Sequence, residues 1–524
     1  MENTILLTTM FLVIYTGGNI WILLKSKHSM LFNFLFWVFW VTSVLLIVEI
    51  TISRLTLFYL CPTIGISLLC YTFLNKDDRV ENDDVFHVTL PHRKGKIYLE
   101  NIRRGVSIIG AAGSGKTESI IALFLQHFSR NGFSGVIHDY KDFELTEIAY
   151  PMLNKENTDF YCISFEPVHH RVNPIAPRYL DSAEAINEVV RVLLSNLLEQ
   201  KEEINSGTGK FFSDAVEGLM AGLIWRLKTN YKHICTLPHL IALFHELDTK
   251  SLVKFLSASP ISKAMANAFL QGVESERQTA GVLSTLSNAF KKITTLRIFY
   301  VLSADEVPLN LNQQERPTIV SLVNNPQYES AYAPVIATIM HTITKQMSVR
   351  DANPSFLLFE EAPTIRLNNM HRIPATLRSF DIATLYVMQD KIQNDMMYGD
   401  KASKAILSNL SYQFFGKVND PDTAKYYERF FEIIKSPTKS VNRSHTINFD
   451  TRITTGEKEV SKIRADTFFR LKPGEFISFA DGREKRIHFK KPKLEKQAPE
   501  ITSGIDLKIN FANIYLEVKA IFNS

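Results

Sequence analysis

One octapeptide constrains the fold of this chain more than any other segment: residues 110–117 read GAAGSGKT. This sequence satisfies the pattern G-x-x-x-x-G-K-S/T, in which glycines let successive backbone N–H groups point at phosphate oxygens. An apolar run at 106–109 precedes it directly, and residues 118–129 carry apolar side chains at helical spacing. Strand, glycine loop and helix are the context that a phosphate-binding loop requires. The sequence therefore predicts an α/β fold with a nucleotide site.

Every residue of this loop is a candidate ligand of ATP: Gly110, Ala111, Ala112, Gly113, Ser114, Gly115, Lys116 and Thr117. In such a loop the lysine reaches the β- and γ-phosphates, and the final hydroxyl ligates Mg²⁺. We therefore assign Lys116 a catalytic role and Thr117 a metal-binding role. Residues 207–210, GTGK, lack the upstream glycine and the Ser or Thr, and we predict an ordinary loop there.

Acidic partners for this loop are predicted at the end of another strand. The apolar run 355–359 has the pattern of a buried strand and ends in Glu360 and Glu361. Carboxylates at the C-terminal end of such a strand lie beside bound phosphates, so we assign Glu360 to Mg²⁺ and Glu361 to the attacking water. The alternative is a solvated helix N-terminus, where acidic residues are also favoured, although Pro363 makes an immediate helix less favourable.

Two further polar residues follow the carboxylates. Arg378 closes the segment 371–378, and Gln389 ends the strand-like run 383–388. A glutamine at the end of a strand beside the acidic strand is well placed to sense the γ-phosphate. Each residue also has a plainer interpretation, as a surface arginine and as a strand-end glutamine bonded to a loop.

The N-terminus has a different character. Residues 4–24, 31–48 and 55–74 are three runs without charged residues, each near the length that crosses a bilayer. The basic residues Lys25, Lys27, Lys76 and Arg79 predict that the loop after the first run and the rest of the chain are cytoplasmic. We expect three spans, or alternatively a hairpin of two.

Composition adds little to these motifs. Hydrophobic residues make up 45% and charged residues 22%, which suits a globular chain with some membrane content. A formal net charge of +5 permits nucleic acid or anionic lipid as a partner without requiring either. The four cysteines form no C-x-x-C pair, so neither a zinc site nor a disulfide framework is indicated.

Four segments together carry a family resemblance: the glycine loop, the strand end FLLFEEAP at 356–363, the stretch 377–402, and NDPDTAKYYERFF at 419–431. Their order and spacing resemble the type IV coupling proteins, the membrane ATPases of bacterial conjugation and type IV secretion. The family's second Gln and its Tyr-Gly pair correspond to Gln393 and Tyr398-Gly399, and its C-terminal strand and turn to 476–482.

This resemblance implies a RecA-like P-loop NTPase core with an inserted all-α domain. It implies a membrane anchor at 1–79, nucleotide-binding parts at 80–181 and 296–490, the insert at 182–295 and a short C-terminal tail at 491–524. It also implies a homo-hexamer in the bacterial inner membrane that receives DNA with a relaxase, or a protein, and feeds a type IV secretion channel. Arg378 stands where the family supplies an arginine to the neighbouring subunit, and Gln389 at its sensor position.

Three points leave alternatives open. The family usually has Asp-Glu where this chain has Glu360-Glu361, so a nucleotide-gated assembly component that translocates nothing remains a hypothesis. A double-stranded DNA translocase of the chromosome-segregation type is another, although residues 497–524 are too short for the winged-helix module that such proteins carry. The basic run at 483–493 fits DNA contact, or an edge strand protected by charge.

Overall fold

The structure is a computed structural model that describes residues 84–198, 207–443, 451–501, 504 and 506–522. All three apolar runs predicted to span a membrane lie outside these residues. Among the helices in the described ranges, none is long and apolar enough to cross a bilayer. Residues from Asp84 onward form one compact unit, and the following description concerns that unit.

A nine-stranded sheet organises this unit, in the order β13-β12-β9-β3-β8-β7-β4-β6-β5. The strands from β9 to β5 are parallel to their neighbours, and β12 and β13 are antiparallel additions at one edge. The strands are β3 (Val106–Ile109), β4 (Ser134–Asp139), β5 (Asp159–Ile163), β6 (Thr318–Val323), β7 (Ser355–Phe359), β8 (Ile382–Met388), β9 (Tyr412–Phe415), β12 (Glu475–Ala480) and β13 (Arg483–His488). The predicted α/β class is confirmed.

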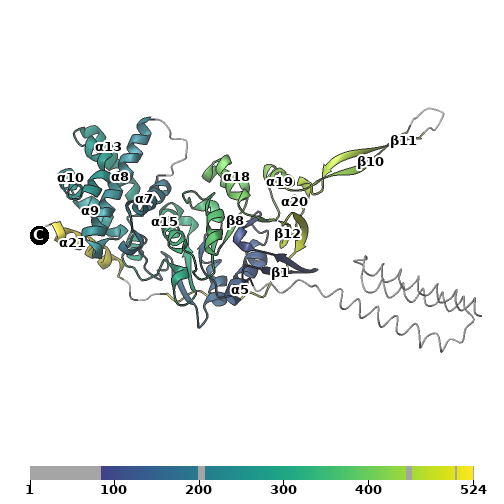
Figure 1. Ribbon diagram of the computed structural model, residues 1–524, viewed down its shortest axis with the longest axis horizontal. Helices are drawn as coiled ribbons and strands as arrows, with labels where there is room; N and C mark the ends of the chain where they lie inside the picture. Colours follow the sequence, from purple (N-terminus) through teal and green to yellow (C-terminus); the bar gives the residue numbers. More distant parts are fainter. Residues whose placement is uncertain (1–83, 199–206, 444–450, 502–503, 505, 523–524) are drawn as a thin grey trace, which may run out of the picture. The chain divides into compact units, whose positions relative to one another are not determined.

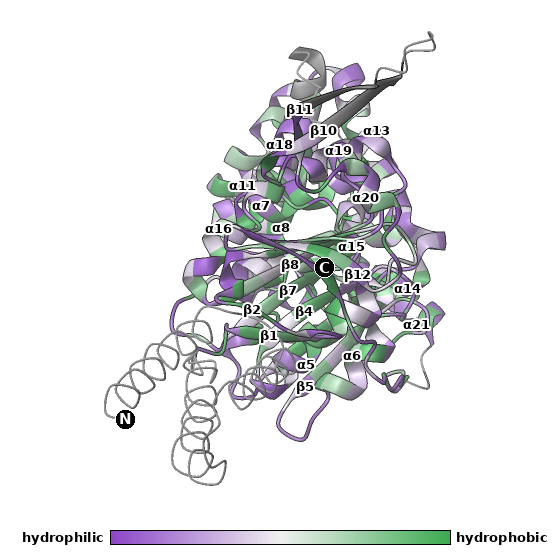
Figure 2. Ribbon diagram, turned by 90° about the vertical axis from the view of Figure 1, so that its right-hand side faces the viewer, coloured by the Kyte–Doolittle hydropathy of each residue, from purple (hydrophilic) through white to green (hydrophobic). Residues whose placement is uncertain are grey.

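The central strands are apolar throughout because both faces of the sheet are covered (Figure 2). Phe356 and Leu358 of β7 face one hydrophobic core, which holds Phe124 and Phe128 of the helix after the glycine loop. Leu357 faces a second core, which holds Ile336 on the opposite face. Successive residues of a strand point to opposite faces, so a continuous apolar run serves both cores.

The first face is covered by η3 (Thr117–Ile121), α5 (Ala122–Arg130) and α6 (Thr146–Leu153), with the hairpin β1 (Val88–His92) and β2 (Gly95–Leu99). The elements of the second face and its edges are α15 (Glu329–Met347), α16 (Ile373–Leu377), α17 (Lys391–Tyr398), α18 (Asp400–Ser408), α19 (Pro421–Glu428) and α20 (Ala465–Phe469). Short helical turns are η2 (Ile102–Arg104), η4 (Pro177–Tyr179), η6 (Leu311–Gln313), η7 (Pro326–Tyr328), η8 (Ala362–Thr364) and η9 (Arg378–Phe380). A second ribbon, β10 (Ile433–Arg443) with β11 (Thr451–Ser461), precedes α20.

A long run of helices separates β5 from β6, and we refer to residues 183–293 as the helical insert (Figure 1). It contains α7 (Ala183–Leu197), α8 (Gly207–Asn230), η5 (Lys232–Ile234), α9 (Leu237–Glu246), α10 (Thr249–Ser257), α11 (Pro260–Met265), α12 (Asn267–Gly272) and α13 (Glu276–Ile293), and α14 (Leu296–Val301) follows it. The prediction of a loop at 207–210 is wrong, since α8 begins at Gly207. Its two glycines lower helix propensity, but the long apolar helix that follows overrides them.

Asp481 and Gly482 have φ of 49° and 72° and form the tight turn between β12 and β13.

The segment predicted to be a short tail, residues 491–524, crosses from the sheet to the insert. Beyond β13 the backbone N–H of Gln497 donates to the Glu147 carbonyl of α6 at 3.0 Å. The chain then ends in α21 (Leu507–Phe522), which lies beside α9 and buries Ile514 and Val518 (Figure 1). An amphipathic helix with two fully buried residues explains why the tail is ordered there.

Candidate nucleotide site

The glycine loop leaves β3 at the C-terminal edge of the sheet. The backbone N–H of Ala111 donates to the Lys417 carbonyl after β9 at 2.7 Å, and the N–H of Gly110 donates to the Met388 carbonyl of β8 at 3.2 Å. Lys116 is 6% exposed and its Nζ donates to the Gly110 carbonyl at 2.5 Å. The loop thus encloses its own lysine. That is the arrangement in which a phosphate group would replace the carbonyl as the ammonium's partner.

Two of its glycines are needed for geometric reasons. Gly113 and Gly115 have φ of 74° and 85°, a region that residues with a Cβ rarely adopt. At Gly115 a Cβ would also lie 2.8 Å from the backbone nitrogen of Gly474, whose N–H donates to the Ser114 carbonyl. At Gly113 a Cβ would meet nothing within 4 Å. The loop is therefore closed on the side of Gly474 and open on the side of Gly113.

The two predicted carboxylates lie at the same edge of the sheet. Glu360 and Glu361 follow β7 and are 1% and 2% exposed, so neither belongs to a solvated helix N-terminus. Lys141, which follows β4, places its Nζ 3.4 Å from Oε1 of each carboxylate. The backbone of Glu361 is left-handed, with φ 46° and ψ 53°, and a single turn of 3₁₀ helix follows it.

Electrostatics link these groups to Lys116. Burial lowers the pKa of Lys116, and the Glu361 and Glu360 carboxylates act in the opposite direction. Burial raises the pKa of Glu360, and the nearby Asp139 carboxylate raises it further, while Lys141 opposes both. Two buried acids at one strand edge attract a cation strongly, because a cation relieves their mutual repulsion.

A Mg²⁺ ion fits this donor set. Oε2 of Glu360 is buried and makes no hydrogen bond within the described part of the chain. A hard cation prefers such a carboxylate oxygen, and Mg²⁺ characteristically takes only one or two carboxylates together with substrate phosphates. No group of three or more His, Cys, Asp or Glu residues able to hold a metal occurs among the described residues.

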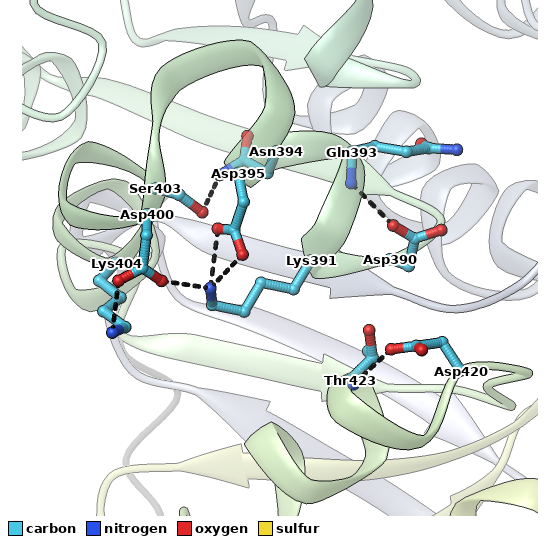
Figure 3. A network of polar contacts seen from close by, with 10 residues as sticks. All are labelled: Asp390, Lys391, Gln393, Asn394, Asp395, Asp400, Ser403, Lys404, Asp420 and Thr423. Carbon is cyan, nitrogen blue, oxygen red and sulfur yellow. Dashed lines mark hydrogen bonds and ion pairs between the residues drawn. The ribbon is translucent and has the colours of Figure 1, made fainter.

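Gln389 contacts the second carboxylate directly: its Nε2 donates to Oε1 of Glu361 at 3.1 Å. The segment after it is fixed by a polar network (Figure 3). Asp390 accepts from the N–H of Gln393 and begins α17, and Lys391 bridges Asp395 of α17 and Asp400 of α18 at 2.6 and 3.2 Å. The end of β8 therefore presents Gln389 from a rigid support.

Arg378 is separated from these residues. It is exposed and stands in η9, directly before β8, whereas Gln389 stands directly after that strand. Seven strand residues span roughly 20 Å, so within one chain Arg378 lies at the opposite edge of the sheet from the carboxylates. The structure brings together Lys116, Glu360, Glu361 and Gln389, and leaves Arg378 outside.

Sequence reasoning missed two participants. Lys141 is an isolated basic residue in the sequence, and its place two residues after the buried strand 134–139 is the signal that could have identified it. Asn196, at the C-terminal end of α7, gave no signal because its contact with the loop after Glu361 spans 170 residues of sequence. Both residues border or adjoin a pocket of about 570 Å³ that opens beside Glu361 and Gln389 and is walled by α7, α15 and α17.

The basic run after Gly482 has a structural explanation. Arg483–His488 form β13, the edge strand of the sheet. Arg486 pairs with Glu475 of the adjacent strand at 2.7 Å, and Lys491 pairs with Glu118 beside the glycine loop. Charged side chains on an edge strand discourage pairing with other sheets. These contacts favour the protected edge over DNA contact for this run.

Comparisons with known proteins agree with this fold. The structure resembles the bacterial conjugative coupling protein TrwBdeltaN70 in an unbound form, at 11% identity and a TM-score of 0.57, covering 77% of this chain and 88% of that one. The plasmid coupling protein TrwB in complex with ADP and Mg²⁺ gives 12% identity, a TM-score of 0.57 and coverage of 77% and 89%. At such identities the likeness concerns the fold alone. A search of curated protein sequences finds no match.

The family assignment rests on the sequence. The model for the DNA-binding domain of type IV secretion-system coupling proteins matches residues 96–446, more than half of the chain. That span includes the glycine loop, both carboxylates and Gln389. The chain therefore belongs to the type IV secretion-system coupling protein family.

Proposed function

We propose that this protein is an ATP-driven coupling protein that delivers DNA with its relaxase, or a protein, to a type IV secretion channel and helps to pump DNA across the inner membrane. The observation that carries the proposal is the convergence of Lys116, Glu360, Glu361 and Gln389 on one edge of the sheet. TrwB, a protein of similar fold, has been solved with ADP and Mg²⁺ and with a non-hydrolysable ATP analogue, which supports ATP and Mg²⁺ as the ligands here.

Each residue has a role in hydrolysis. Residues Gly110–Thr117 bind the phosphates, and Lys116 neutralises charge on the γ-phosphate. Glu361 orients the attacking water and accepts its proton as the water oxygen bonds to phosphorus and ADP leaves. Gln389, bonded to Glu361, holds that carboxylate in place. Thr117 and Glu360 would hold Mg²⁺, which stabilises negative charge on the phosphate oxygens when it is bound.

The test is ATP turnover by the full-length protein with and without single-stranded DNA. We expect turnover without DNA and faster turnover with it. Turnover that DNA leaves unchanged would favour the nucleotide-gated assembly component, and stimulation by double-stranded DNA alone would favour the segregation-type translocase. Absence of any turnover, with folded protein and Mg²⁺ present, would refute the proposal.

A ring of subunits gives Arg378 a role, because an arginine far from its own site is free to serve a neighbour's. We expect Arg378→Ala to bind ATP normally and to lose turnover, since an arginine supplied in trans is worth about 10³–10⁵ in rate. Mixing Arg378→Ala with Glu361→Gln should restore part of the activity, because some interfaces then pair an intact Arg378 with an intact Glu361. Full activity of Arg378→Ala alone would make it a surface arginine.

A further inference from the structure

Glu361 is held in a conformation that it would not adopt alone. Its left-handed backbone, φ 46° and ψ 53°, is unfavourable for a residue with a long side chain. Such a conformation persists only where the surroundings determine it, and it is characteristic of functional sites. Contacts that hold residues 361–367 therefore decide whether the Glu361 carboxylate stays beside Gln389 and Lys141.

Two residues outside the helical insert, Thr364 and Tyr398, make some of these contacts. The backbone N–H and the Oγ1 of Thr364 both donate to the Glu361 carbonyl, at 3.0 and 2.7 Å. The Tyr398 hydroxyl, at the end of α17, accepts from the N–H of Leu367 and donates to the carbonyl of Ile365, at 3.2 and 3.1 Å. These bonds fix both sides of Arg366 but leave its own peptide groups to another partner.

That partner belongs to the helical insert. The Asn196 amide stands in the last turn of α7; its Nδ2 donates to the Arg366 carbonyl at 2.9 Å, and its Oδ1 accepts from the Arg366 N–H at 3.0 Å. A single side chain thus satisfies the donor and the acceptor of one loop residue, which fixes its orientation as well as its position. In the adjacent position, the Leu197 carbonyl accepts from Lys292 of α13 at 2.6 Å, so the end of α7 is tied to the body of the insert.

We propose that Asn196 is a positioning residue through which the helical insert controls the catalytic carboxylate. We call the two hydrogen bonds between Asn196 and Arg366 the Asn196 clamp. With the end of α7 in its present place, the clamp holds residues 361–367 in position and keeps the backbone of Glu361 left-handed. A shift of α7 breaks both bonds, and Glu361 relaxes to an ordinary backbone conformation with its carboxylate displaced. A partner that binds the insert would in this way set the rate of hydrolysis. The inference rests on the proposed ATPase function.

The test compares ATP turnover and amide hydrogen exchange in full-length protein carrying Asn196→Ala. We expect kcat to fall by between about 10- and 100-fold, the range for a displaced catalytic group, with KM for ATP unchanged because the glycine loop is untouched. The Arg366 and Thr364 amides should exchange faster. Asn196→Asp keeps the size of the side chain but loses the donor, so it should show the same fall in kcat at unchanged KM without leaving a cavity.

Ser195→Ala is the matched control. Ser195 lines the same pocket on the same turn of α7, but its hydroxyl donates to the Val192 carbonyl of its own helix. It should leave kcat, KM and exchange at residues 361–367 as in the unmodified protein.

The outcomes separate this inference from the proposed function. If the unmodified protein hydrolyses ATP and both Asn196 variants keep its kcat, the clamp plays no part in positioning Glu361. A fall in kcat matched by a rise in KM and by lower thermal stability would also overturn the inference, since it would show general unfolding. If the unmodified protein itself shows no turnover, the proposed function fails, whatever the exchange data show.

Discussion

The two walls of the nucleotide site are built on different principles. The glycine loop is continuous in sequence, and its conformation follows from glycines at positive φ and from bonds to adjacent strand ends. The carboxylate wall is assembled from distant segments: Lys141 after β4, Asn196 from α7 and Gln389 after β8 all act on Glu360, Glu361 or the loop behind them. The first wall makes its bonds within the sheet, so it is suited to binding phosphates whatever the position of the helical insert. The second wall includes a contact with the insert and can respond to a movement of it.

The largest effects should separate binding from turnover. Lys116→Ala should weaken ATP binding and abolish turnover, because the γ-phosphate loses its cationic partner. Glu361→Gln should bind ATP as before and turn it over about 10²–10⁴-fold more slowly, the range for loss of a general base. Equilibrium binding of a fluorescent ATP analogue and steady-state turnover check the pair, with Lys263→Ala, an exposed residue of α11, as control. Tight binding by Lys116→Ala would remove the distinction between the walls.

An intermediate effect should expose how rigid the glycine loop is. Gly113→Ala changes only the backbone preference, since its Cβ meets nothing within 4 Å, whereas Gly115→Ala also forces a Cβ to 2.8 Å from the Gly474 nitrogen. We expect Gly113→Ala to cost about 1–2 kcal/mol of unfolding free energy and Gly115→Ala clearly more. Denaturant unfolding without nucleotide measures both. Equal losses would mean that the Gly474 backbone yields readily.

The smallest effect should come from the support of Glu361. Gln389→Ala removes the bond from Nε2 to the Glu361 carboxylate, and we expect kcat to fall by about tenfold, a typical cost of one hydrogen bond to a charged group. KM for ATP should not change. Gln393→Ala, which lines the same pocket, is the control. If Gln393→Ala slows turnover as much as Gln389→Ala, the pocket rather than the bond matters.

Sequence reasoning succeeded where the information was local. Residues 106–121 hold strand, loop and helix in one run, and residues 355–361 hold a buried strand and its acids, so the α/β fold, the glycine loop and the two buried acids were predictable. It failed where a contact joins segments far apart. Lys141 is an ordinary polar residue whose importance comes from the strand order, which places the end of β4 next to that of β7. Asn196 is another, and its importance comes from the end of α7, which lies against the loop after β7. Only the start of the helix at 207–230 was misjudged: a loop was predicted at 207–210, and the long apolar helix that follows overrode two glycines there.

Arg378 shows a different limit. A position between Glu361 and Gln389 in sequence does not imply a position between them in space, because β8 carries the chain from one edge of the sheet to the other. Residues that precede a parallel strand and residues that follow it face opposite edges. Its proposed role therefore depends wholly on a second subunit.

The docking of α21 has a consequence for the order of folding. The apolar surface of α9 and α14 that receives Ile514 and Val518 belongs to residues 237–301, so during synthesis it stays uncovered until the ribosome has passed residue 522. The contacts of α21 also close a very long loop, and such late, non-local contacts slow folding and leave apolar surface exposed to other chains. His239 and Glu517, 3.0 Å apart, mark where that loop closes. A chain interrupted before α21 would accordingly be a substrate for chaperones and proteases even with its nucleotide site intact.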